Sequence, residues 1–166
     1  MARLVLIDAS PLIGLTIVEG LAWLKTLFGV VWIPEEVRRE VLSGKVERGE
    51  KAISAAIEAG WLSVWPDTVK SLEFLKLDEG ETACITIGVN HPEDVLLIMD
   101  ERAGRATAIE NGLKITGTAA IIGMAKTKGL IPSARKVFEI LHQSDFRIST
   151  EVIKTILAKV GETPKK

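Results

Sequence analysis

The stretch LVLIDASPLI, residues 4–13, places four aliphatic side chains in a row and then a single carboxylate, Asp8. A continuous aliphatic run is typical of a parallel strand that is covered on both faces. A second run of this kind, VLLIM at residues 95–99, ends at Asp100. A charge at the end of a buried strand costs free energy unless a partner or a function requires it. The sequence therefore raises the question of what Asp8 and Asp100 do.

The regions around these two runs predict the fold class. Weaker strand patterns lie at residues 30–33, 61–65 and 114–116. Helical patterns lie between and after the strands, at residues 10–19, 21–28, 34–42, 50–59, 81–89, 102–110, 118–128, 133–143 and 149–160. Strands that alternate with helices indicate an α/β fold: one domain in three layers, with a central, mostly parallel sheet of about five strands flanked by helices.

The ends of these segments carry the usual signals. Ser10 is predicted to cap the first helix, with Pro11 as its first residue. Pro34 is predicted to begin a later helix in the same way. We expect residues 1–145 to form the domain, and residues 146–166 to form a C-terminal helix and a frayed tail packed on it.

The composition limits the functional classes. The chain has 166 residues, with 21 basic and 22 acidic side chains, so a polyanion would need a local basic patch. The single cysteine, Cys84, excludes an internal disulfide framework and suits a reducing compartment. No uncharged apolar stretch approaches the roughly 20 residues of a membrane span. We therefore expect a cytoplasmic protein without a membrane partner.

Asp8 and Asp100 are expected to lie close together. Ligands of open α/β sheets bind outside the carboxyl ends of the strands. The two most apolar strands are predicted to be a central pair, which brings Asp8 and Asp100 to one edge. The alternative for each residue is a role as a helix cap, for which aspartate is favoured.

Two further acids join this edge by helical spacing. Glu40 follows Glu36 by four residues, an unfavourable like-charge pair, and should border the packed face of its helix. A solvated surface position is the alternative for Glu40. Glu81 follows Asp78 by three residues, which is an acidic variant of the capping box, so helix capping is its alternative role.

A cluster of carboxylates needs protons or a cation. Two unit charges 4 Å apart repel by about 1 kcal/mol in water and by about 4 kcal/mol at an effective dielectric of 20. The candidate ligands are all carboxylates, and oxygen ligands select a hard cation, Mg²⁺ or Mn²⁺. Carboxylates that hold such ions are a recurring arrangement for phosphodiester hydrolysis.

The order of these motifs resembles the PIN-domain ribonucleases. The series is DASPLI, LFGVVWIPEEVRREV, LDEGETACI, LIMDERAGRATA, GTAAIIGMAK, GLIPS and FRIS, and it spans nearly the whole chain. It is similar to a prokaryotic subgroup related to VapC toxins. The resemblance implies a PIN-like fold and a metal-dependent endoribonuclease that cuts RNA, with a protein antitoxin as partner and a homodimer as the assembly.

The resemblance also implies a set of site residues. The acidic quartet of the family matches Asp8, Glu40, Glu81 and Asp100. Glu101 is a second candidate for the fourth metal ligand, and Glu81 stands where the commoner toxin pattern has Asp. Ser10 and Thr118 match small polar positions near the site.

Basic side chains outside the quartet have two interpretations. Arg105 could meet a phosphate or a site carboxylate, or lie on a solvated helix face. A basic track for RNA could come from four side chains for which a helix-terminal role is the simpler explanation: Lys126, Lys128, Arg135 and Lys136.

Two other functional classes are alternatives. A haloacid-dehalogenase-type phosphatase would need an aspartate where Ser10 stands, and a phosphoacceptor receiver domain would need one at the end of its third strand, where Pro66-Asp67 is a poor match. A PIN-like module that binds RNA or protein without cutting is the remaining alternative.

Overall fold

A sheet of five parallel strands, in the order β3-β2-β1-β4-β5, forms the centre of the molecule in the computed structural model, which describes residues 3–45, 47–66, 74, 76–91 and 94–162. The strands are β1 (Leu4–Ile7), β2 (Val31–Ile33), β3 (Leu62–Val64), β4 (Val95–Ile98) and β5 (Lys114–Thr116). All five lie within the predicted segments, and the parallel sheet confirms the predicted fold class.

The two continuous aliphatic runs form neighbouring strands. β1 is the middle strand and pairs with β4 from Leu4↔Val95 to Ile7↔Ile98. Every residue of both strands is buried. A strand without a solvated face must be covered on both sides, which is why these sequences lack polar alternation. The prediction that they form a central pair is confirmed.

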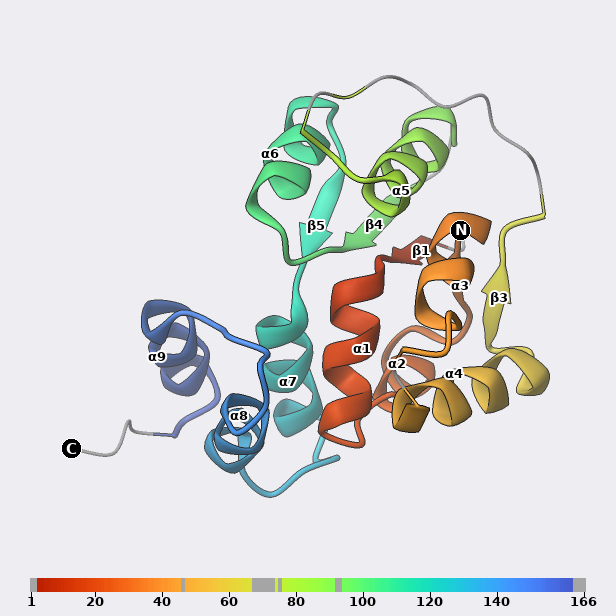
Figure 1. The fold of residues 1–166 in the computed structure, drawn as a ribbon. Coiled ribbons are helices and arrows are strands. Elements are labelled where there is room, and N and C mark those ends of the chain that lie inside the picture. Colours follow the sequence, from red (N-terminus) through yellow and green to blue (C-terminus); the bar gives the residue numbers. More distant parts are fainter. Residues whose placement is uncertain (1–2, 46, 67–73, 75, 92–93, 163–166) are drawn as a thin grey trace.

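Helices cover both faces of the sheet (Figure 1). α5 and α6 lie along one side, and α1, α2, α4 and α7 lie along the other. The helices are α1 (Ala9–Ile17), α2 (Trp23–Phe28), α3 (Glu35–Val41), α4 (Glu47–Ala59), α5 (Glu79–Asn90), α6 (Arg102–Glu110), α7 (Thr118–Thr127), α8 (Ala134–His142) and α9 (Thr150–Lys159). Among the described residues, no helix is long and apolar enough to cross a membrane.

The predicted start of the first helix is wrong. α1 begins at Ala9, so Asp8 rather than Ser10 occupies the N-cap position, and Pro11 is the third helical residue. The first N–H groups of a helix have no intrahelical acceptor, so a proline in the first turn costs no hydrogen bond. Pro34, which is predicted to begin its helix, instead lies at the N-cap of α3, one residue before the helix, with an extended ψ of 158°.

A second apolar cluster joins the C-terminal helices to the body. α9 packs against α7 and α8, and Ile122, Phe138, Leu141 and Leu157 form the buried centre of this contact. The contacts between α8 and α9 join residues on both sides of position 145. The predicted boundary between residues 1–145 and 146–166 stays a prediction. Residues 163–166 of the predicted tail lie outside the described residues.

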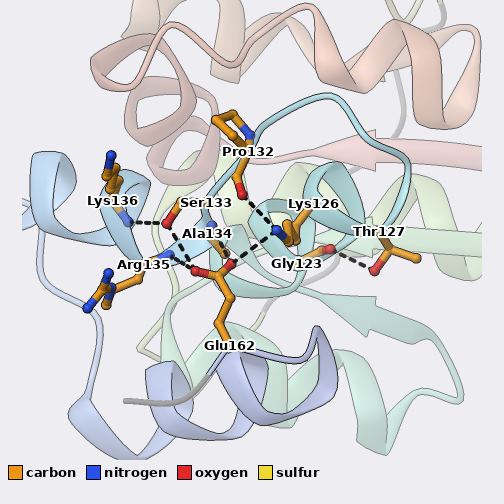
Figure 2. A network of polar contacts seen from close by, with 9 residues as sticks. All are labelled: Gly123, Lys126, Thr127, Pro132, Ser133, Ala134, Arg135, Lys136 and Glu162. Carbon is orange, nitrogen blue, oxygen red and sulfur yellow. Dashed lines mark hydrogen bonds and ion pairs between the residues drawn. The ribbon is translucent and has the colours of Figure 1, made fainter. Parts of the chain in front are cut away.

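The Glu162 carboxylate, just after the end of α9, accepts hydrogen bonds from the beginning of α8 (Figure 2). The amides of Ala134 and Arg135 donate to Glu162 at 2.6 and 3.2 Å, and the Ser133 hydroxyl donates at 3.0 Å. Lys126 Nζ lies 4.0 Å from the same carboxylate. Burial acts to raise the pKa of Glu162, but these donors and the Lys126 charge outweigh it and lower the pKa. Glu162, which follows the end of α9, therefore serves as a capping group for α8.

Candidate active site

Asp8 stands at the carboxyl edge of the middle strand. Its backbone N–H donates to the Ile98 carbonyl at 3.0 Å, so the chain after β1 stays beside the end of β4. Asp100 follows that end by two residues, and the Met99 amide donates to the Thr116 carbonyl of β5 at 2.9 Å. The ends of β1, β4 and β5 thus meet at one edge, as the aliphatic runs predict.

The Asp8 carboxylate is buried without full satisfaction of its oxygens. The residue is 3% exposed, and within the described residues its Oδ1 has no hydrogen-bond partner. Although Asp8 holds the N-cap position, its side chain makes no capping bond to α1. Its pKa is raised to about 7, mainly by burial. The Ala9 amide acts to lower this pKa, and the charges of Asp78, Glu81 and Glu40 act to raise it. A buried acceptor of this kind is expensive unless something else occupies it.

Glu81 combines a structural and a site position. Asp78 caps α5 and accepts the Glu81 amide at 2.8 Å, while Glu81 Oε1 accepts the Asp78 amide at 3.2 Å. The capping box that the spacing allows is therefore present. The other oxygen, Oε2, has no partner among the described residues, and the residue is 5% exposed. Burial is the main cause that raises its pKa to about 7, and the charges of Asp78 and Glu101 add to it.

Glycines allow close contact with these carboxylates. A Cβ at Gly80 would lie 3.1 Å from Asp8 Oδ1 and 3.5 Å from Asp78 Oδ1. Both aspartates therefore border the same backbone position of α5. A Cβ at Gly104 would collide with Glu81 Oε2 and would lie 2.6 Å from Met99 Sδ. Side chains at either position would intrude on the carboxylates.

Glu40 joins from α3 and opens the group to solvent. It is exposed, and burial of its carboxylate and the Asp78 charge raise its pKa. α3 packs against α5, which brings Glu40 toward Asp78. A cavity of about 380 Å³, which we call the acidic cavity, lies between these helices. It is lined by Glu36, Arg39, Glu40, Asp78, Glu79 and Gly80.

Asp100 contacts the beginning of α7. The Thr118 amide and hydroxyl donate to its two oxygens at 2.9 and 2.6 Å. Thr118 is fully buried, so in this structure its hydroxyl orients Asp100. Arg105 Nη1 donates to the Met99 carbonyl at 2.8 Å, and a Cβ at Gly117 would contact both Asp100 Oδ1 and Arg105 Nη1.

The structure thus brings some of the predicted acids together more closely than others. Asp8, Glu40 and Glu81 influence one another or share the Asp78 charge. Glu101 lies at the N-cap of α6 and acts on Glu81. No interaction between Asp100 and the other acids is found among the described residues, and Ser10 is half-buried in α1.

Asp78 is an acid whose site position the sequence reasoning missed. Its spacing to Glu81 was interpreted as capping, which is correct. Its charge also raises the pKa of Asp8, Glu40 and Glu81, which makes it a shared neighbour of the group. The signal was the density of acids in LDEGE, residues 77–81.

The fit of a divalent cation can be tested on these oxygens. As the side chains lie, no group of three or more His, Cys, Asp or Glu within the described ranges could hold a metal ion. The two partnerless oxygens, Asp8 Oδ1 and Glu81 Oε2, are nevertheless hard donors that need a cation or protons. The donor chemistry therefore fits Mg²⁺ or Mn²⁺, and the carboxylates would have to converge on the ion.

The fold and the acidic edge define a nuclease-type α/β domain with its carboxylates at the carboxyl ends of parallel strands. The chain belongs to the PIN-domain family, whose match covers residues 4–162. The predicted family is therefore confirmed, while the toxin subgroup stays a prediction. No curated protein and no solved structure matches the chain.

Proposed function

We propose that this protein is a metal-dependent endoribonuclease that hydrolyses RNA phosphodiester bonds. The observation that carries the proposal is the pair of buried, partnerless oxygens, Asp8 Oδ1 and Glu81 Oε2, at the carboxyl edge of the sheet. A structural role alone would leave both oxygens unsatisfied at a cost of about 1–3 kcal/mol each. A PIN domain adds a nuclease-type fold to that chemistry.

The acids would share the work of holding Mg²⁺ or Mn²⁺. Asp8, Glu40 and Glu81 approach from β1, α3 and α5, and Asp100 or Glu101 completes the set from the end of β4. When bound, such a cation lowers the pKa of an attacking water and neutralises developing negative charge. Asp8 and Glu81, each with a pKa near 7, can hold a proton at neutral pH while no cation is present.

Three other side chains would position the acids and the substrate. Thr118 fixes the rotamer of Asp100 through two hydrogen bonds. Arg105 is held at the same edge by the Met99 carbonyl, where a guanidinium can meet a phosphate oxygen. Ser10, in the first turn of α1, lies two residues after Asp8 and can donate to the strand being cut.

The biological setting that fits this activity is a type II toxin–antitoxin pair. This part of the proposal rests on the resemblance of the motif series to VapC-like toxins, with a homodimer, a cytoplasmic location and a protein antitoxin encoded nearby. A gene for a small, charged DNA-binding protein beside this one would support the pairing. Light scattering of the purified protein tests the dimer.

The enzyme activity is tested by RNA cleavage with Mn²⁺. The wild type and Glu58→Gln, which removes an exposed carboxylate of α4, should cut RNA, and Asp8→Asn should not. EDTA should stop the wild type. Equal cleavage by the wild type and Asp8→Asn would show that the assigned site is wrong. No cleavage by the wild type would favour the alternative, a non-catalytic module that binds RNA or protein.

A further inference from the structure

A second cavity, which we call the arginine cavity, opens beside Asp100. It has a volume of about 780 Å³ and is lined by residues from the beginning of α7 and from the connection between α8 and α9. Arg102 and Arg105 of α6 line it from one part of the chain, and Arg147 of the connection lines it from another. Within the described lining, Asp100 is the one carboxylate, and Thr118 donates to both of its oxygens. The cavity therefore carries an excess of positive charge.

The arginines keep donors free for a ligand. Arg147 Nη1 donates to the carbonyls of His142, Ser144 and Phe146, which fixes the guanidinium at the end of α8. Among the described residues, Arg147 Nε and Nη2 have no acceptor, and the Arg102 side chain has none either. A guanidinium presents five N–H donors in a planar fork, which suits phosphate oxygens. Arg102 and Arg147 thus line the same cavity from two separate segments, and both have N–H groups without an acceptor among the described residues.

Part of the cavity lining is apolar. It includes Phe146 and Ile148, and Phe146 packs on α1 at Gly14. A Cβ at Gly14 would lie 2.8 Å from the Phe146 ring, so the glycine permits this contact. Cationic side chains beside an aromatic platform are the combination by which single-stranded nucleic acids are bound: phosphates meet the charges and bases stack on the ring.

We propose that the arginine cavity binds one nucleotide of the single strand next to the bond that the acids cut. The phosphate lies between Arg102 and Arg147, and the base or ribose lies against Phe146 and Ile148. The position beside the cut bond rests on the proposed function, because Asp100 belongs to the acid set and also lines this cavity. The binding itself does not depend on cleavage. With a net charge of −1, the chain needs such a local site to hold a polyanion.

The test is fluorescence anisotropy of a short labelled oligouridylate in EDTA, which separates binding from cleavage. Arg102→Ala and Arg147→Ala should each weaken binding about three- to tenfold, and each should reduce the slope of log K against log salt by about 0.7. Lys51→Ala is the charge-matched control, since that exposed side chain lies in α4, outside the cavity lining. It should leave both quantities unchanged.

Each outcome separates the two proposals. If the wild type binds the RNA, loses affinity in Arg102→Ala and yet does not cut RNA with Mn²⁺, the cavity assignment stands and the nuclease function fails. If Arg102→Ala binds like Lys51→Ala, or if the wild type does not bind, the cavity assignment is wrong even if the protein cuts RNA. If Arg147→Ala does not fold, the RNA affinity of Arg102→Ala alone tests the cavity assignment. A DNA strand of the same sequence must not bind more tightly than RNA, since a preference for DNA would contradict an RNA subsite.

Discussion

Asp78 and Glu81 cap α5 reciprocally, and this exchange occupies only one oxygen of Glu81. Oε1 accepts the Asp78 amide at 3.2 Å, whereas Oε2 has no partner among the described residues. Glu81 can therefore cap the helix and also belong to the site. The cap fixes the carboxylate in place, and the other oxygen lies beside Gly104 of α6.

This double role predicts that Glu81→Gln separates stability from activity. Glutamine can retain the capping box, because its side-chain oxygen can accept the same amide. The variant should unfold with a free energy within about 1 kcal/mol of the wild type, or above it, since one charge leaves the cluster. Its cleavage rate with Mn²⁺ should fall at least about a hundredfold, in the range of a lost major catalytic group. Urea unfolding and initial cleavage rates measure the two effects, and a fully active Glu81→Gln would remove Glu81 from the site.

The raised pKa of Asp8 predicts a pH-dependent stability of the metal-free protein. The pKa is about 7 in the fold and 3.8 as the reference value, so the folded protein binds more protons between these values. Stability in EDTA should therefore fall as the pH rises from about 4 to about 7. Asp8→Asn has no such penalty and should be more stable than the wild type at pH 8, by about 1–3 kcal/mol.

Denaturant unfolding in EDTA at about pH 4.5 and about pH 8 measures this change in stability, because these values lie near the two ends of the range over which Asp8 titrates. The difference between Asp8→Asn and the wild type should shrink at the lower pH. The difference between Glu58→Gln, on the exposed face of α4, and the wild type should not change with pH. A wild type that is as stable as Asp8→Asn at pH 8 would mean that the buried carboxylate has a partner.

Thr118→Val tests whether the hydroxyl of Thr118 positions Asp100. Valine keeps the shape of threonine but leaves Asp100 Oδ2 without its 2.6 Å donor. We expect a loss of about 1 kcal/mol in stability and a reduction of about tenfold in cleavage. Thr118→Ser restores the hydroxyl and should recover most of the activity. If valine and serine behave alike in cleavage assays, the orientation of Asp100 does not depend on this bond.

Glu162→Ala tests the attachment of α9 to α8. The lost cap should destabilise the protein by about 0.5–2 kcal/mol at pH 7. Because the pKa of Glu162 is lowered in the fold, its contribution is present above the reference value of 4.5 and disappears as the pH falls through the folded pKa. Unfolding of Glu162→Ala and of the control Glu139→Ala, an exposed residue of α8, at neutral and acid pH measures this. A cost for Glu162→Ala that persists unchanged in acid would contradict the capping role.

The local features of the fold could be predicted from the sequence. β1 and β4 were identified because fully covered parallel strands have continuous aliphatic runs, and this also placed Asp8 and Asp100 at one edge. The sequence does not determine the first residue of α1, since Ser10 and Asp8 are both favoured caps and Pro11 fits several positions of a first turn.

The arrangement between helices could not be predicted in the same way. The Asp78 charge reaches Glu40 because α3 packs on α5, which no local spacing shows. The arginine cavity likewise needs Arg102 and Arg147, which are far apart in the chain. Asp100 was predicted as part of one compact quartet, but its contacts are with Thr118, and its membership of a metal site stays a prediction.

The central claim is that the acids at the carboxyl edge bind a divalent cation. Calorimetric titration of the metal-free protein with Mn²⁺ tests it most directly. The account predicts binding with a dissociation constant of about a millimolar or lower for the wild type and for Glu58→Gln, in the range where binding free energy reaches about −4 kcal/mol. It predicts no measurable binding for Asp8→Asn or Glu81→Gln. Equal heats for Asp8→Asn and the wild type, or no heat for the wild type, would contradict it.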